Sequence, residues 1–151
     1  MRETPSTPNP LKSQVLIRDA NEADVPFIFN SWLKSYRNAS LCRSITNPVY
    51  FAFQHQLIEA LLKHNYVKVV CTAADSNQLL GYIVYGEQEG IKIVHYAYIK
   101  HAFRNMGMCR MMLQSAGIVN GGFYTHETPS GARAAERMGL VYNPYLAGVI
   151  E

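Results

Sequence analysis

The sequence predicts a single α+β domain in which about four helices pack against a mostly antiparallel sheet. Its 151 residues match the usual size of one folded unit. With 48% apolar and only 17% charged residues, the composition supports a buried core and excludes a disordered chain. The spacing of apolar residues changes along the chain in the order strand, two helices, three closely spaced strands, helix, strand, helix, strand.

The amino-terminal half supplies the first strand and two helices. Residues 1–14 are rich in proline and are expected to be a flexible arm, so that the domain spans residues 15–151. Asp24 is a suitable cap for the first helix, with Pro26 in its first turn. In the second helix, Phe51, Ile58, Leu61 and Leu62 are expected to face inward. The predicted elements are a strand over 15–18, a helix over 25–37 and a helix over 47–64.

The middle of the chain predicts an antiparallel meander. Its strands cover residues 66–73, 79–85 and 92–99, and the turn-rich segments 75–78 and 86–90 join them. A helix over 106–116, a short strand over 123–126 and a helix over 130–138 ended by Gly139 follow, and the tail could hold one or two short strands. A strand contributed by a partner chain could complete the sheet, so both monomer and homodimer stay open.

Several function classes are excluded or disfavoured by composition. The cysteines, Cys42, Cys71 and Cys109, are widely spaced and lack any paired spacing, so we predict neither disulfides nor a metal site. No apolar run approaches the roughly 18 residues of a membrane helix. The amino terminus has no apolar signal core, which favours a cytoplasmic location. The net charge of +3 is too mild to indicate nucleic acid by itself.

An anion site is predicted where the third meander strand runs into the next helix. Between Glu89 and Glu127 the chain has no carboxylate, yet this stretch contains Lys92, Lys100, Arg104 and Arg110. The first N–H groups of a helix have no partner inside it, and together with the helix dipole they favour a phosphate group. Gly107 leaves the backbone open to such a group.

These residues resemble the GNAT superfamily of N-acetyltransferases. The family signature, Arg/Gln-x-x-Gly-x-Gly/Ala, stands here as Arg104-Asn105-Met106-Gly107-Met108-Cys109. The segments Ile17-Arg18-Asp19-Ala20, followed by Asp24, and Met138-Gly139-Leu140 add support. The resemblance implies an α/β/α arrangement whose mixed, mostly antiparallel sheet splays apart between strands 4 and 5.

The same resemblance implies acetyl-CoA as the cofactor. The pyrophosphate would bind the amides of residues 105–110, with charge from Arg104, and the pantetheine arm would pair with the backbone of Ala97, Tyr98 and Ile99. An N–H group near Ile99 would polarise the thioester carbonyl, and an amine would attack it directly without a metal. The predicted cofactor-binding residues are Ala97, Tyr98, Ile99, Arg104, Asn105, Met106, Gly107, Met108, Cys109 and Arg110.

The sequence departs from the family pattern at the acid and base positions. Ala135 stands where many members have a tyrosine acid, and Ile93 stands where some have a glutamate base. Candidates for the acid are Tyr124, Tyr142 and Tyr145. Candidates for the base are His95, which strand alternation places on one face with Ile93, Ala97 and Ile99, and His126. The catalytic set that we predict is His95, His126 and Tyr145.

Structural roles compete with the functional ones. The alternative to a catalytic role for His95 is a structural one, as a half-buried, hydrogen-bonded histidine in the sheet, and the same alternative applies to His126. Trp32 and Tyr36 are predicted to line the acceptor pocket, although an aromatic stripe at helical spacing is more often core.

The leading functional hypothesis is transfer of an acetyl group from acetyl-CoA to the amine of a small molecule or protein, with no membrane partner. One alternative is a catalytically silent GNAT-like binding or inhibitory module, favoured by Ala135 and the short tail. Another is acylation of a modified nucleic-acid base, because Thr125-His126 and residues 142–145 resemble small bacteriophage acetyltransferase-like proteins. Nucleic acid is not the favoured partner, given the mild charge.

Overall fold

The structure, a computed structural model, describes residues 14–148. Most of the predicted arm, residues 1–13, and the last three residues, 149–151, lie outside the described part. Gln14 was assigned to the arm, but its carbonyl already accepts a hydrogen bond of 2.8 Å from the N–H of Ala73. The sheet therefore holds the chain from one residue earlier than predicted.

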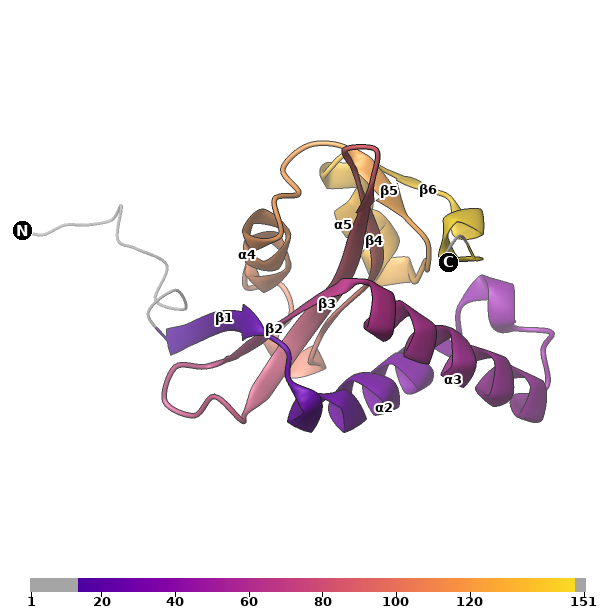
Figure 1. Cartoon of the computed structure of the whole chain (residues 1–151), viewed down its shortest axis with the longest axis horizontal. Helices are drawn as coiled ribbons and strands as arrows, with labels where there is room; N and C mark the ends of the chain where they lie inside the picture. Colours follow the sequence, from indigo (N-terminus) through magenta and orange to yellow (C-terminus); the bar gives the residue numbers. More distant parts are fainter. Residues whose placement is uncertain (1–13, 149–151) are drawn as a thin grey trace, which may run out of the picture.

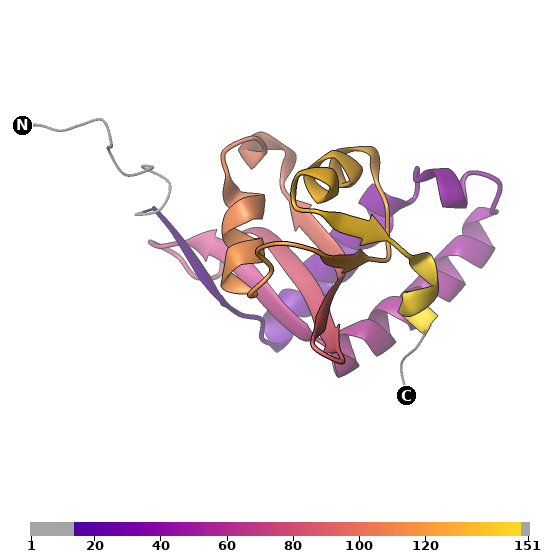
Figure 2. The same cartoon turned by 90° about the horizontal axis from the view of Figure 1, so that it is seen from above.

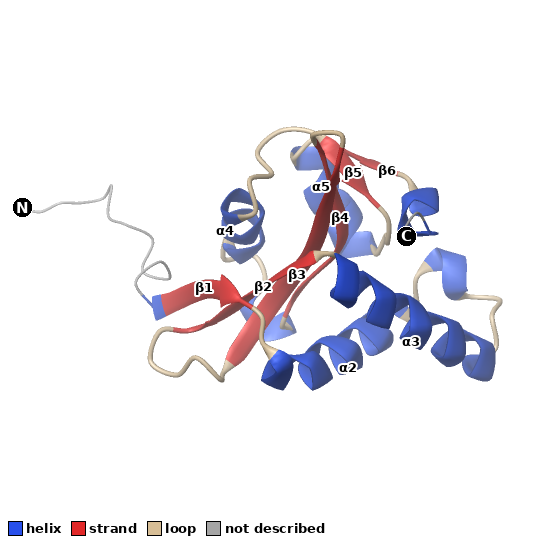
Figure 3. Ribbon diagram, in the orientation of Figure 1, coloured by secondary structure: helices blue, strands red, loops and turns tan. Residues whose placement is uncertain are grey.

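A mixed, six-stranded sheet forms the centre of the molecule (Figures 1 and 3). The strands lie side by side in chain order, β1 to β6. The first three pairings are antiparallel, while β4 pairs with β5, and β5 with β6, in parallel. The strands are β1 (Val15–Asp19), β2 (Tyr66–Thr72), β3 (Leu79–Gln88), β4 (Ile91–Ile99), β5 (Gly122–Tyr124) and β6 (Leu140–Tyr142).

Helices cover both faces of the sheet, as predicted. They are α2 (Val25–Tyr36), α3 (Asn47–His64), α4 (Met108–Ser115) and α5 (Pro129–Arg137), with short 3₁₀ turns η1 (Glu22–Asp24), η2 (Ser40–Cys42), η3 (His101–Phe103) and η4 (Pro144–Gly148). Two separate apolar cores result, one under α2 and α3 and the other under α4 and α5. Figures 1 and 2 show α2 and α3 together on one side of the sheet and α4 on the other.

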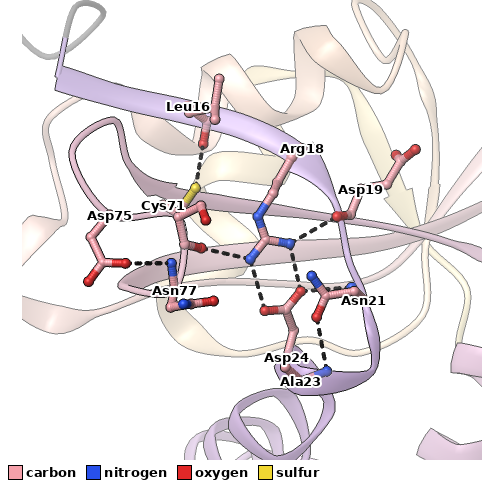
Figure 4. Close-up of polar contacts among 10 residues, drawn as sticks. Leu16, Arg18, Asp19, Asn21, Ala23, Asp24, Cys71, Asp75 and Asn77 are labelled. Carbon is pink, nitrogen blue, oxygen red and sulfur yellow. Dashed lines mark hydrogen bonds and ion pairs between the residues drawn. The ribbon is translucent and has the colours of Figure 1, made fainter.

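The start of α2 is fixed by a buried ion pair and not by a simple cap. Asp24 occupies the cap position, but its side chain makes no capping hydrogen bond to α2. Instead its carboxylate accepts two hydrogen bonds from Arg18, of 2.8 and 3.0 Å, and one from the N–H of Asn21 (Figure 4). Arg18 also donates to the carbonyl of Ser76, so one guanidinium links β1, the first turn of α2 and the β2–β3 turn.

The inner face of α3 differs from the prediction. Ile58 and Leu61 are buried as expected, and Leu62 is partly buried, but Phe51 is 44% exposed. Tyr50 and Gln54 take the inward positions in the first half of the helix. The phenol of Tyr50 donates to the carbonyl of Leu33 on α2, which fixes the helix rotation at this end and turns Phe51 outward.

The turn between β3 and β4 is shorter than predicted. β3 runs on to Gln88, and only Glu89 and Gly90, with φ of 52° and 80°, form the turn. Gly86 resembled a turn residue in the sequence, but it lies within the strand. Its missing side chain makes room for that of Asn65, which lies between α3 and β2.

Alternation along β4 is interrupted by a bulge at His95. Val84 pairs with Tyr96 and the next β3 residue, Tyr85, pairs with Val94, so that His95 has no partner in the register. Val94 packs in the core under α4 and Tyr96 in the core under α2, although simple alternation would place both on one face. The expectation that Ile93, His95, Ala97 and Ile99 share a face is therefore wrong.

The carboxyl-terminal elements appear in the predicted order with shifted ends. α4 begins at Met108, after Gly107, and β5 ends at Tyr124, before Thr125 and His126. α5 ends before Gly139, whose φ of 71° terminates it as predicted.

The described part of the chain contains no helix that is both long and apolar enough to span a membrane. All three cysteines are free, with Cys42 and Cys71 buried and Cys109 half-buried.

Replacing Asp24 by Asn should destabilise the fold. The change leaves the Arg18 guanidinium facing a neutral amide in a largely buried position, where the side chains are 19% and 4% exposed. We expect the free energy of unfolding to fall by about 2 to 4 kcal/mol, measured by urea denaturation. The matched control is Asp19→Asn, since Asp19 pairs with Lys68 but its side chain is 85% exposed, and little change is expected. Equal effects of the two variants would contradict this role for Asp24.

Candidate functional site

The candidate site is the gap where β4 and β5 part. The two strands pair only at Ile93 with Phe123 and at Val94 with Tyr124, and one further hydrogen bond joins Thr125 N–H to the Val94 carbonyl. Beyond this point β4 continues for five residues to Ile99, whereas β5 has ended. This divergence confirms the predicted splay.

The free edge of β4 exposes backbone groups to the gap. The N–H of Lys100 donates to the Leu80 carbonyl at 2.8 Å, and residues of an antiparallel strand alternate in facing their neighbour. The peptide groups of Ala97 and Ile99 therefore point away from β3, toward the side of β5. Ala97 is also exposed. This part of β4 could pair with an extended ligand, as the resemblance implies.

The start of α4 lies next in the chain and is open to solvent. Gly107 is its cap residue, with φ of 84°, and Asn105 also has a positive φ of 65°. The first backbone hydrogen bond of the helix runs from Met111 N–H to the Gly107 carbonyl, and no side chain in residues 14–148 caps the N–H groups before it. Asn105, Met106 and Gly107 are all exposed. The geometry fits a bound phosphate group.

Arg104 contacts the end of β4. Its Nε donates to the Ile99 carbonyl at 2.8 Å, and its guanidinium lies 5.6 Å from the centre of the Tyr98 ring. These two contacts hold the charge at the end of β4.

A pocket of about 350 Å³ lies between α2 and this end of β4. Phe27 and Tyr98, whose ring centres are 6.2 Å apart, form its aromatic part. The remaining lining is polar or cationic: Asn30, Ser31, Lys34, Ser35 and Arg104. The sequence analysis missed the α2 residues, although their four-residue spacing, 30 with 34 and 31 with 35, forms a polar stripe on the helix.

His95 and His126 are brought together by a residue that the sequence analysis did not select. The Thr125 hydroxyl lies 3.1 Å from Nδ1 of His95 and 2.9 Å from Nδ1 of His126. All three side chains are buried. The Thr125 hydroxyl also lies 3.4 Å from the His95 carbonyl, to which it can donate, so it connects both rings and the β4 backbone.

Burial keeps both histidines neutral. It lowers the pKa of His95 to about 4. Burial and the neighbouring His95 lower the pKa of His126 to about 3. Neither ring lines the pocket on α2. Their catalytic roles stay predictions.

Trp32 and Tyr36 lie in the core and not on a pocket wall. They are 0% and 2% exposed. Trp32 stacks on Tyr96 with ring centres 4.5 Å apart, and the His126 ring meets the edges or faces of Trp32, Tyr36 and Tyr96. Neither side chain is accessible to an acceptor, because the sheet and His126 cover the face of α2 that carries them. The prediction that they bind substrate is thus replaced by a role in packing.

The phenols near the carboxyl terminus differ in how firmly they are held. Tyr124 donates to Glu127 at 2.8 Å, and burial together with this carboxylate raises the pKa of Tyr124 to about 12. The Tyr142 ring lies tilted against that of Tyr124, with ring centres 5.3 Å apart. Tyr145, the predicted catalytic tyrosine, is 85% exposed, and no hydrogen bond within residues 14–148 orients its phenol for catalysis. Ala135, on the inner face of α5, is buried in the core.

Solved acetyltransferase structures share this fold. A Corynebacterium glutamicum protein described as histone acetyltransferase HPA2 and related acetyltransferase aligns with a TM-score of 0.58 and 14% identity, over 83% of this chain and 84% of that one. A candidate acetyl transferase from Pyrococcus furiosus aligns with a TM-score of 0.54 and 19% identity, over 86% and 82%. The acetyltransferase fold predicted from the sequence is therefore confirmed.

A third solved structure aligns over a smaller share of both chains. YhbS from Escherichia coli, described as a GNAT family N-acetyltransferase in complex with CoA, aligns with a TM-score of 0.49 and 18% identity over 68% of this chain. This chain spans only 54% of the length of YhbS. No protein-family model and no curated protein matches the sequence. The resemblance to bacteriophage proteins finds no support in these matches and stays a prediction.

The buried histidine pair should make the fold sensitive to mild acid. Both pKa values lie below the usual 6.5, so the unfolded chain binds protons more readily than the folded one. The stability that comes from burying the two neutral imidazoles is therefore fully present above about pH 6.5. It is lost as the pH falls toward the pKa values that the histidines have in the folded protein. We expect the free energy of unfolding to fall by about 2 kcal/mol for each histidine when the pH is lowered from about 7.5 to about 5. Urea denaturation at the two pH values measures this fall.

The control for this prediction is His126→Phe, which keeps an aromatic ring against Trp32 and Tyr96 but cannot titrate. It should flatten the pH dependence by about half. An unchanged slope in this variant would show that other groups cause the acid sensitivity.

Proposed function

We propose that this chain, which has the GNAT acetyltransferase fold, transfers an acetyl group from acetyl-CoA to an amine. One observation carries the proposal: the gap beside β4 has the open start of α4 on one side and the pocket on α2 on the other. A thioester and a nucleophile could meet in this gap from opposite faces of the sheet.

The residues present fit CoA. The unpartnered N–H groups at the start of α4 and the bare backbone at Gly107 would hold the pyrophosphate. The peptide groups of Ala97 and Ile99 would pair with the pantetheine arm, and the Ile99 N–H would polarise the thioester carbonyl. Acetyl-CoA supplies an activated acetyl group.

The reaction balances without a redox partner or metal. The amine nitrogen forms a bond to the acetyl carbon, and the C–S bond to CoA breaks. An ammonium group must lose one proton before attack and a second one afterwards, and the CoA thiolate takes up one proton. The products are an acetamide, CoA and one proton. In residues 14–148, no cluster of three or more His, Cys, Asp or Glu side chains could hold a metal ion.

His95 and His126 are the candidate bases in this proposal. Neutral imidazole is the form that accepts a proton, but pKa values of about 4 and about 3 make these rings weak bases near neutral pH. Packing at the base of the gap is the competing role.

Substitution separates the two roles. We expect His95→Ala and His126→Ala to lower kcat, by about a hundredfold if an imidazole takes up the proton. Thr125→Val keeps the volume of the side chain but removes the hydroxyl that links the two rings. It should lower kcat nearly as much as the alanine variants only if protons move between the histidines through this hydroxyl. Circular dichroism would verify folding, and wild-type turnover in both alanine variants would remove both assignments.

A second candidate function is a GNAT-like module that binds CoA without turnover. The observations favouring it are that Ala135, at the acid position of many family members, is a buried core residue and that Tyr145, the predicted catalytic tyrosine, is exposed. Release of free CoA thiol in the presence of an amine panel would support transfer. Tight acetyl-CoA binding without any release would support the silent module.

Acetyl-CoA binding should depend on Gly107. We expect calorimetry to find binding to the wild type near micromolar affinity, and Gly107→Glu to weaken it at least about tenfold, because a carboxylate there would repel and obstruct the pyrophosphate.

Gly107→Ala is the matched control. It imposes the same strain of a side chain at a φ of 84° but adds no charge, so it should retain more of the affinity than Gly107→Glu. Failure of the wild type to bind acetyl-CoA would overturn the proposed function.

A further inference from the structure

We propose that the acceptor carries an anionic group, a carboxylate or a phosphate, beside its amine, and that Lys34 and Arg104 bind this group in the pocket on α2. The inference rests on the proposed function and specifies its acceptor. It comes from the charge and position of the pocket.

The pocket is on the acceptor side of the sheet. It is built on α2 and the Tyr98 side chain, both of which pack in the core under α2 and α3. The open start of α4 belongs to the opposite face, where Met108 packs in the other core. A nucleophile must reach the acetyl carbon from the side that the bound CoA leaves free, which is the side of α2.

The charge of the pocket is positive. Lys34 and Arg104 both line it, and no aspartate or glutamate does. Among the described residues, the ion pairs involve other cations, namely Arg18, Lys68 and Lys92. Lys100 lies just beyond the aromatic wall, with its ammonium 5.4 Å from the centre of the Phe27 ring. A cationic acceptor such as a polyamine would be repelled here.

Arg104 is already oriented for binding. Its Nε donates to the Ile99 carbonyl and its guanidinium lies near the Tyr98 ring, while neither terminal nitrogen has a hydrogen-bond partner within residues 14–148. A positioned guanidinium loses less conformational entropy when it binds an anion than a free one does.

Polar groups complete the lining. The Ser31 hydroxyl donates to the Phe27 carbonyl at 2.7 Å and lies 3.1 Å from the phenol of Tyr82, and the Ser35 hydroxyl bonds to the phenol of Tyr96. These contacts fix both hydroxyl oxygens on the stripe of α2 that carries Lys34. The volume of about 350 Å³ lies at the small end of ligand sites. A small amine with one acidic group fits this size and chemistry.

Binding can be tested apart from turnover. Amide chemical shifts of the whole chain, alone and with CoA, would be followed during titration with two anionic probes, O-phosphoethanolamine and β-alanine, which carry a phosphate or a carboxylate beside the ammonium group. Ethanolamine and β-alaninamide, which carry the ammonium group but no acidic group, are their counterparts. We expect the anionic probes to shift the signals of residues 31–35 at concentrations about tenfold lower than the counterparts that lack an acidic group. Lys34→Gln should remove about tenfold of that affinity. Lys63→Gln is the matched control, since Lys63 stands in the last turn of α3 as Lys34 does in that of α2, and should change nothing.

Equal binding of the anionic probes and of their counterparts without an acidic group, or no effect of Lys34→Gln, would overturn the proposal. So would a tenfold loss of acetyl-CoA affinity in Lys34→Gln with the preference for anionic probes intact, because the lysine would then serve the phosphates of CoA. Acetyl transfer to the same four amines gives the second readout, and the preference should appear in kcat/KM. Probe binding as expected without acetyl-CoA binding would leave the anion site standing while the proposed function falls.

Discussion

The parting of β4 and β5 is the constraint on which the candidate site depends. A bulge at His95 bends β4 at the point where β5 ends, and beyond it Tyr96 and His126 pack against each other with Trp32. These rings fill the base of the gap, so the strands cannot close over it. The peptide groups of Ala97 and Ile99 are left facing away from β3, with the Ile99 carbonyl bonded to Arg104, and the short connection through Arg104 leads to the start of α4.

The position of α2 depends on a second, more distant interaction. Arg18 and Asp24 tie the first turn of the helix to β1 and to the β2–β3 turn. The same helix carries Lys34 and the serines of the pocket two to three turns later. An ion pair at one end of α2 thus helps to set the lining at the other, because the helix between them moves as a rigid element.

In the histidine pair, tight packing and imidazole basicity oppose each other. Burial of His95, Thr125 and His126 packs the base of the gap tightly, and the same burial lowers the imidazole pKa values far below neutrality. A base works best with a pKa near the working pH. Tighter burial of this pair therefore makes its imidazoles weaker as candidate bases in the proposed reaction.

The sequence by itself determined the element order, the meander and the glycine at the open start of α4, because apolar spacing, turn residues and helix signals are local. It could not place the bulge at His95, the bond of Thr125 to both histidines, the burial of Trp32 and Tyr36 or the exposure of Tyr145. The pocket was also invisible, since Lys34 and Arg104 are distant in the chain. These features depend on which surfaces meet when helices and strands pack, and only the tertiary structure decides that.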